Sequence, residues 1–266
     1  MGGKVLRGTE KDITARIRRA KKILFFLDYD GTLVPIRKKP SLARLARKKK
    51  LFLKKLASRT RIKVFIISGR SLENVKRLVG IKRIACIGNH GIELEGPGVS
   101  YVNKKAKAIK PLVRKIYREL KKVFRGKKYK GVLLEDKGYT LSFHYRMARR
   151  QKIPLIKKLF KDTIAPYLAG RRIRITEGKK IFEVRPNIDW HKGKILNWAL
   201  KRFGPKGSLV ICIGDDRTDE DAFRALGGKG VSILVSKKKK KTSAQYRLRS
   251  PEEVMKFLKG VIARAR

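Results

Sequence analysis

Short apolar runs that end in small or acidic residues recur along the chain. They occupy residues 23–28, 64–68, 84–88, 209–214 and 231–235. Continuous apolar strands of this kind are typical of a parallel sheet that is covered on both faces. Because helical stretches lie between them, the pattern predicts a doubly wound, Rossmann-like α/β fold with a mostly parallel sheet.

Three of the stretches between these strands have apolar residues at helical spacing. We expect helices from about residue 41 to 57, directly after Ser71, and over residues 195–203. The clearest helix start is near the end of the chain, where Ser250 is followed by Pro251 and then by Glu at 252 and 253. A capping serine, a proline at the first helical position and a glutamate three residues after the cap favour a helix beginning there.

The middle of the chain has a different pattern, in which two hairpins alternate with two helices. The expected elements are a helix over 104–125, strands over 132–135 and 140–145, a helix near 154–168, and strands over 173–176 and 181–184. This α-β-β-α-β-β order predicts a small α+β cap domain inserted into the larger fold. We place the catalytic core domain at residues 1–99 and 188–266, and the inserted domain, which would confer substrate specificity, at 100–187.

Composition adds a strong basic charge to this picture. The chain has 266 residues, of which 42 % are hydrophobic, so it can bury a sizeable core. Its 72 Lys and Arg against 21 Asp and Glu give a formal net charge of +51. Such a charge attracts sugar phosphates, nucleic acid and anionic membranes alike, and a solvated basic surface without a partner also explains it. The charge therefore indicates an anionic partner without selecting one.

No membrane or disulfide signal changes this picture. Cys86 and Cys212 each lie within an apolar run and are expected to be core residues. The apolar run at 23–27 is far too short to span a bilayer, and basic residues interrupt the first twenty positions. We expect a soluble, cytoplasmic, monomeric protein with no membrane partner.

The first predicted strand ends in two aspartates, Asp28 and Asp30, and Gly31 follows them. Ligands of open α/β sheets gather outside the carboxyl ends of the strands, so these carboxylates could share one site. One would act as a nucleophile and the other would transfer protons. A surface turn explains an Asp-x-Asp-Gly sequence by itself equally well.

Three other segments favour the catalytic interpretation. Ser68 begins a Ser-Gly-Arg-Ser sequence after the second strand, in which a hydroxyl and loop amides suit a phosphoryl oxygen, although plain capping by Ser71 would also explain it. Residues 214–221 contain five of the 21 carboxylates within seven positions, which suits Mg²⁺. An acidic helix start capped by Thr218 would explain only the later part of that cluster. Lys192 supplies a cation just before another predicted helix.

In this order, the sequences DYDGTL, SGR, Lys-Gly and GDDRTDEDAF resemble the four motifs of phosphatases of the haloacid-dehalogenase superfamily. More closely, the chain resembles the trehalose-6-phosphate phosphatase family, and the resemblance runs from about residue 23 to 223. The stretches that support it are GNHG at 88–91, EDK at 135–137, HYR at 144–146, EVRP at 183–186 and DWHKGK at 189–194.

The resemblance implies a Mg²⁺-dependent hydrolysis of trehalose 6-phosphate, the last step of trehalose biosynthesis, through an aspartyl-phosphate. Asp28 would be the nucleophile, and Asp30 would protonate the leaving sugar oxygen and then activate water. Ser68 and Lys192 would bind phosphoryl oxygens. The implied metal ligands are Asp28, Asp30, Asp215 and Asp219. The implied substrate-binding residues are Thr32, Gly69, Arg70 and Asn89 in the core, and Glu135, Lys137, Arg146, Lys179 and Glu183 in the inserted domain.

Two alternatives remain at this point. The same fold could act on another sugar phosphate, such as sucrose 6-phosphate or a phosphorylated glycosylglycerate. A protein of another class, one that binds nucleic acid, would use the high charge and the lysine tract at 237–241. The basic residues are spread along the chain, and no known nucleic-acid-binding motif occurs, so this charge predicts only nonspecific nucleic-acid binding.

Overall fold

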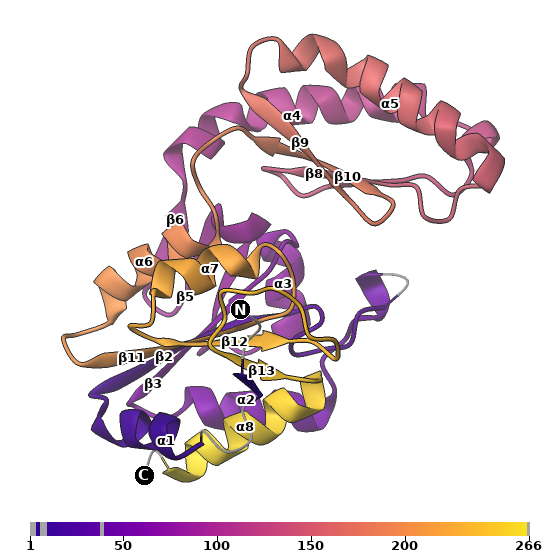
Figure 1. The fold of residues 1–266 in the computed structure, drawn as a ribbon. Helices are drawn as coiled ribbons and strands as arrows, with labels where there is room; N and C mark the ends of the chain where they lie inside the picture. Colours follow the sequence, from indigo (N-terminus) through magenta and orange to yellow (C-terminus); the bar gives the residue numbers. More distant parts are fainter. Residues whose placement is uncertain (1–3, 6–9, 38–39, 265–266) are drawn as a thin grey trace. The chain divides into compact units, whose positions relative to one another are not determined.

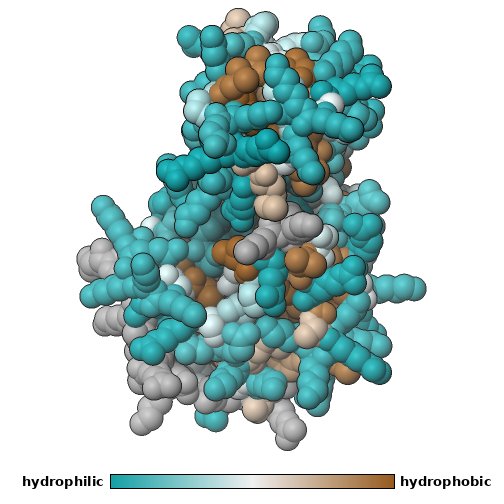
Figure 2. Space-filling model, turned by 90° about the vertical axis from the view of Figure 1, so that its right-hand side faces the viewer, coloured by the Kyte–Doolittle hydropathy of each residue, from teal (hydrophilic) through white to brown (hydrophobic). Residues whose placement is uncertain are grey.

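The computed structural model describes residues 4–5, 10–37 and 40–264. The chain divides into two compact units, the first formed by Met1–Tyr101 with Trp190–Arg266 and the second by Val102–Asp189. No helix of the described residues is both long enough and apolar enough to cross a bilayer. Hydrophilic side chains cover most of the face drawn in Figure 2.

A nine-stranded sheet with the order β1-β13-β12-β11-β2-β3-β4-β5-β6 forms the centre of the first unit (Figure 1). The neighbours from β1 to β4 pair in parallel, and β5 is antiparallel to β4. The fold class predicted from the sequence is therefore confirmed. The strands are β1 Lys4–Val5, β2 Lys22–Asp28, β3 Ile62–Ile67, β4 Ala85–Gly88, β5 Glu93–Gly96, β6 Val99–Val102, β11 Ser208–Gly214, β12 Val231–Val235 and β13 Tyr246–Leu248.

Helices cover both faces of this sheet, which is why its central strands are apolar throughout. On β2, Phe25 packs into a core shared with the helices α1, α2, α3 and α8, whereas Phe26 packs into a core shared with α6 and α7. Successive side chains of a strand point to opposite faces, so each strand needs apolar residues at every position. These helices are α1 Glu10–Arg19, α2 Arg47–Ala57, α3 Leu72–Val79, α6 Lys192–Phe203, α7 Asp219–Leu226 and α8 Pro251–Arg264.

The first unit differs from the sequence prediction in several places, among them α1, β1 and β13, which were not predicted. The helix expected from about residue 41 begins only at Arg47, because Pro40–Leu42 form a short 3-10 turn and the Tyr29 hydroxyl donates to the carbonyl oxygen of Ala43 at 3.0 Å. Strands β5 and β6, which extend the sheet beyond β4, were not predicted. The Gly-Pro-Gly sequence at 96–98 between them is a turn signal that could have revealed this hairpin.

The second unit has the order α4-β7-β8-α5-β9-β10, and its sheet has the strand order β7-β8-β10-β9. Both helices lie on one side of this sheet (Figure 1). The apolar face of the sheet packs against them, and Phe143 and Phe182 of the sheet contact Phe160 of α5. The alternate residues of the same strands are largely polar and lie on the other face. The elements are α4 Lys104–Val123, β7 Leu133–Asp136, β8 Leu141–His144, α5 Ile153–Leu168, β9 Ile173–Gly178 and β10 Ile181–Pro186.

Candidate active site

The carboxyl ends of the parallel strands bring the predicted motifs of the first unit together. Strand β2 ends on Asp28, and the following loop turns sharply at Gly31, whose φ is +88°. A Cβ atom on Gly31 would lie 2.2 Å from Oδ2 of Asp215, which follows β11. Only glycine therefore allows the two loops to approach this closely.

Lys192 joins two of the acidic motifs. Its Nζ donates to Asp28 Oδ1 at 2.7 Å and to Asp219 Oδ1 at 2.7 Å, and the lysine side chain is 1 % exposed. His191 sets this position, because its Nδ1 accepts from the amide of Gly193 at 3.2 Å and caps α6. An ammonium group has three donors, so these two contacts leave one further donor on Lys192.

The acidic loop after β11 is organised around Asp219. Its Oδ2 accepts from the amides of Asp215 at 3.0 Å and Asp216 at 3.1 Å. The start of α7 is capped by Asp216, whose Oδ1 accepts from the amide of Thr218 at 2.8 Å and from the Thr218 hydroxyl at 2.7 Å. Thr218 occupies the N-cap position of α7 as suggested, but its side chain makes no capping hydrogen bond, and Asp216 Oδ1 accepts from the amide of Asp219 at 3.3 Å instead.

Three carboxylates in this loop and on β2 suit a divalent cation. Asp28, Asp215 and Asp219 offer oxygen atoms that all lie within 4.8 Å of one another. Burial raises the pKa of Asp28 well above its usual range against the opposing charge of Lys192. Burial, with the neighbouring carboxylates, raises the pKa of Asp215 to about 7 and that of Asp219 to about 6. Hard oxygen ligands held together against their mutual repulsion are the donor set that Mg²⁺ prefers, so these residues fit that ion.

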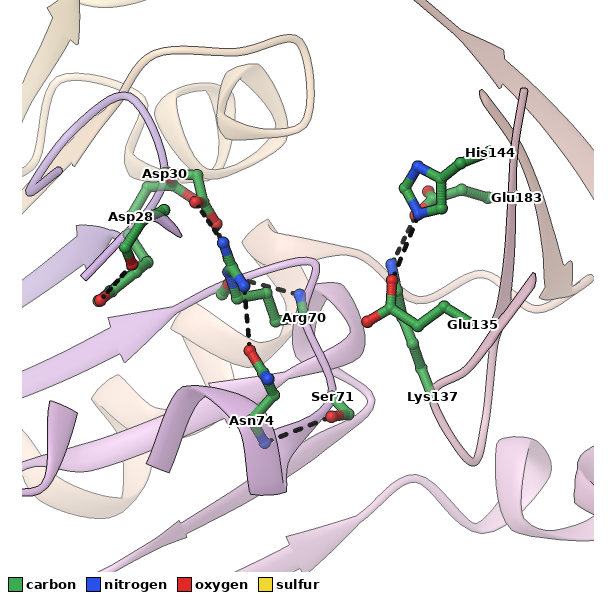
Figure 3. Close-up of polar contacts among 12 residues, drawn as sticks. Asp28, Asp30, Arg70, Ser71, Asn74, Glu135, Lys137, His144 and Glu183 are labelled. Atoms are coloured by element: carbon green, nitrogen blue, oxygen red, sulfur yellow. Dashed lines mark hydrogen bonds and ion pairs between the residues drawn. The ribbon is translucent and has the colours of Figure 1, made fainter. Parts of the chain in front are cut away.

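The carboxylate of Asp30 is outside this group of three because Arg70 holds it. Arg70 Nε donates to Asp30 Oδ2 and Nη2 donates to Oδ1, each at 2.7 Å, while Nη1 donates to Asn74 at 3.0 Å (Figure 3). Asn74 lies in the first turn of α3, where Ser71 caps the helix as predicted. Arg70 was predicted to bind substrate, but in the structure its side chain binds the carboxylate of Asp30, the predicted proton carrier.

The remaining predicted site residues of the first unit lie on loops near Asp30 and Arg70. Ser68 is buried, and its Oγ accepts from the amide of Arg70 at 3.2 Å. The Thr32 hydroxyl is buried without a hydrogen-bond partner among the described residues. Asn89 is 1 % exposed, and its side-chain amide donates to Glu93 at 2.7 Å.

In the second unit, three of the five predicted residues lie on the polar face of the sheet. Lys137 Nζ donates to Glu183 Oε1 at 3.0 Å, and Glu135 contacts His144 at 3.3 Å (Figure 3). Glu135 and Glu183 both pair with Ser142 in the sheet register, so they occupy the same face. The other two predicted residues are exposed and adjacent, since Arg146 Nη2 donates to the carbonyl oxygen of Lys179 at 3.2 Å.

The sequence interpretation missed several residues of this polar face. Ser142 donates to Glu183 at 3.2 Å, and Arg185 contacts Glu183 Oε2 at 3.5 Å. Arg185 could have been found from the two-residue alternation of its strand, because it lies two positions after Glu183. Ser142 is identified only by the strand pairing, which places it opposite both Glu135 and Glu183. Glu93 in the first unit was also missed.

The chain is similar to proteins of one family over most of its length. The sequence model of the trehalose-phosphatase family matches residues 26–252. Trehalose-phosphate phosphatase B of Arabidopsis thaliana is 35 % identical over 258 residues, which cover 92 % of this chain and 67 % of that protein. The probable trehalose-phosphate phosphatase 4 of Oryza sativa subsp. japonica is 36 % identical over 248 residues, which cover 90 % of this chain and 66 % of that protein. The chain thus spans about two thirds of the length of these relatives.

Solved structures give the same result. The C-terminal domain of C. albicans trehalose-6-phosphate phosphatase superimposes with a TM-score of 0.78 at 25 % identity, covering 99 % of this chain and 98 % of that one. The Aspergillus fumigatus trehalose-6-phosphate phosphatase superimposes with a TM-score of 0.65 at 28 % identity, covering 98 % of each chain.

Proposed function

The chain belongs to the trehalose-phosphatase family, and from this we propose that it hydrolyses trehalose 6-phosphate to trehalose and phosphate with Mg²⁺ and an aspartyl-phosphate on Asp28. The observation that supports the chemistry best is the contact of Lys192 with both Asp28 and Asp219 at a buried sheet edge. A cation held there between carboxylates suits a reaction that depends on positioning and on charge neutralisation.

Asp28 is the proposed nucleophile. One of its oxygens accepts from Lys192 at 2.7 Å, which fixes the orientation of the carboxylate. A carboxylate oxygen of Asp28 attacks phosphorus, and the bond from phosphorus to the sugar oxygen breaks. Lys192 and Ser68 bind the equatorial phosphoryl oxygens, whose charge is spread in the transition state.

Asp30 is the proposed proton carrier. In the first step it gives a proton to the departing sugar oxygen, and in the second it takes a proton from the water that attacks phosphorus and releases Asp28. Arg70 holds the Asp30 carboxylate by two parallel hydrogen bonds of 2.7 Å. Such paired bonds fix the plane of a carboxylate, so Arg70 orients the proton carrier.

Mg²⁺ would be held by Asp28, Asp215 and Asp219, whose oxygens cluster within 4.8 Å of one another. When bound, it would neutralise charge on the phosphoryl group. Asp219 also orients the loop amides of 215 and 216, so it both contributes to the cluster and shapes the loop.

The polar face of the inserted unit is the proposed binding surface for the sugar. It presents two carboxylates and an ammonium group: Glu135 on β7, Glu183 on β10, and Lys137 directly after β7, with β8 between the two strands. Charged groups of both signs on a rigid sheet suit the many hydroxyl groups of a disaccharide, which both donate and accept hydrogen bonds. Sucrose 6-phosphate and phosphorylated glycosylglycerates are the competing substrates to be tested.

The test is phosphate release from a panel of sugar phosphates, with Mg²⁺ and with a chelator. We expect turnover of trehalose 6-phosphate that requires the metal, and loss of turnover in Asp28→Asn. Asp221→Asn is the matched control, since Asp221 lies in the same acidic cluster but pairs with Arg224 on the surface of α7. Turnover that survives chelation, or a higher kcat/KM for another sugar phosphate, would contradict the proposal.

A further inference from the structure

Two loops at the sheet edge are joined closely to each other. The first, residues 68–71, follows β3, and the second, residues 89–91, follows β4. The amide of Asn89 donates to the carbonyl oxygen of Arg70 at 2.7 Å, and the amide of His90 donates to that of Ser68 at 3.0 Å. The position of the Ser68 loop therefore depends on the conformation of the second loop.

That second loop has an unfavourable backbone conformation. Asn89 and His90 both have positive φ values, +48° and +57°. Residues other than glycine adopt the left-handed region at a cost in free energy, and persist there only where surrounding contacts hold them. A Cβ atom on Gly69 would lie 2.5 Å from the ring of His90, so the two loops also pack tightly.

Glu93 supplies contacts that hold both loops. Its Oε1 accepts from the side-chain amide of Asn89 at 2.7 Å and from the backbone amide of Leu72, the first residue of α3, at 2.9 Å. Glu93 is partly buried at the start of β5, where it pairs with Gly88 in the sheet register. Hydrogen bonds to a carboxylate are stronger than neutral ones, especially where water is excluded.

We propose that Glu93 is a positioning residue for phosphoryl transfer, and this inference rests on the proposed function. Glu93 fixes Asn89, the amide of Asn89 holds the carbonyl of Arg70, and the Arg70 side chain holds Asp30. The same contacts keep Ser68 in place. Asn89 then serves to join the two loops, a role that differs from the sugar contact implied by the family resemblance.

Glu93 and Glu95 provide a matched pair of variants on one strand. The Glu95 carboxylate is about half exposed and pairs with Lys76 on the surface, so Glu95→Gln is the control. In Glu93→Ala the acceptor is lost, whereas in Glu93→Gln an amide oxygen still accepts both hydrogen bonds without the charge. Glu93→Gln is therefore the conservative variant that should restore function.

The assay compares kcat and KM for trehalose 6-phosphate and for p-nitrophenyl phosphate, which lacks the sugar. Displacement of a reacting group by about 1 Å can cost on the order of 100-fold in rate. We expect Glu93→Ala to lower kcat by about that factor with both substrates, Glu93→Gln to recover most of the loss, and Glu95→Gln to match the wild type. Three results for Glu93→Ala would overturn the inference. They are a loss of kcat with trehalose 6-phosphate only, no loss of kcat with either substrate, and a loss of kcat equal to the unfolded fraction of the variant measured by thermal unfolding.

Hydrogen exchange gives a readout that does not depend on activity. The amides of Leu72, Asn89 and His90 should exchange faster in Glu93→Ala than in the wild type, while amides of the β2 and β3 strands should not change. Unchanged exchange at the two loops would overturn the inference. If the wild type releases no phosphate from either substrate, the proposed function fails, and hydrogen exchange alone decides the role of Glu93.

Discussion

Replacing Lys192 by methionine perturbs the site most directly. The variant keeps the length of the side chain but removes the cation that lies 2.7 Å from both Asp28 and Asp219. These two carboxylates are 8 % and 1 % exposed, so they would remain buried without a partner. Removing one partner of a buried ion pair typically costs about 3–5 kcal/mol, and we expect Lys192→Met to lower the free energy of unfolding by that amount at pH 8.

The loss should be smaller in acid. The pKa values of Asp215 and Asp219 are already raised to about 7 and about 6, and removing Lys192 would raise that of Asp219 further. A carboxyl group whose pKa is higher in the folded than in the unfolded state binds its proton more tightly when folded. Its contribution to stability is therefore largest at low pH and disappears as the pH rises through the folded-state pKa. Since one pKa unit corresponds to about 1.4 kcal/mol, the cost of the substitution should fall by about 2 kcal/mol between pH 8 and pH 5.5.

The assay is urea unfolding followed by the fluorescence of Trp190 and Trp198, at both pH values and without metal. Lys201→Met is the control, because Lys201 is an exposed residue of the same helix and its loss should change stability by less than about 0.5 kcal/mol. If Lys192→Met is as stable as the control at pH 8, or loses the same stability at both pH values, the assignment of a buried ion pair to these residues is refuted.

Three further predictions concern separate parts of the molecule. Arg70→Met should lower kcat for trehalose 6-phosphate about 10- to 100-fold, because Asp30 is released. The rate of the first step with p-nitrophenyl phosphate should fall less, because that leaving group needs no proton. If the single-turnover rate falls by the same factor with both substrates, Arg70 does not have this role. Ser250→Ala should lower the free energy of unfolding by about 1 kcal/mol without changing kcat/KM. The reason is that the Ser250 hydroxyl accepts from the amide of Glu253 at 3.3 Å at the start of α8. An unchanged midpoint of urea unfolding would show that this cap does not stabilise the protein. Binding to a random single-stranded oligonucleotide can be measured by fluorescence anisotropy, and the logarithm of the binding constant should fall linearly with the logarithm of the salt concentration. A binding constant that does not change with salt would indicate a nucleic-acid site that the charge alone does not explain.

The parts of the fold that follow from local pattern could be predicted from the sequence. The apolar runs identified the central strands β2, β3, β4, β11 and β12, and the rule that parallel strands end at one edge placed Asp28 near the acidic loop. Strand β5, between β4 and the edge strand β6, was missed because Glu93–Gly96 alternates acidic and other residues instead of forming an apolar run. The segment before α2 is held by a hydrogen bond from the Tyr29 hydroxyl to the carbonyl oxygen of Ala43, a contact that local pattern does not reveal.

The candidate site was also predicted only in part from the sequence. The residue types pointed to Asp30 and Arg70 separately, but only the direction of the side chains shows that Arg70 holds Asp30 by two bonds. Glu93 was overlooked because its role depends on loop amides that are brought to it by the pairing of β4 with β5. Motifs therefore pointed to the groups that we propose to react, whereas the groups that orient them required the structure.

The central claim is that a phosphoryl group passes through Asp28. It is tested most directly by mass spectrometry of peptides from enzyme that has been mixed with trehalose 6-phosphate and Mg²⁺ and quenched in acid within one turnover. We expect one phosphoryl group on the peptide that contains Asp28. We expect more of it in Asp30→Asn that has been mixed with p-nitrophenyl phosphate, because that leaving group needs no proton whereas hydrolysis of the aspartyl-phosphate is slowed. Phosphate release without any phosphorylated peptide, or a phosphoryl group on another residue, would contradict the account.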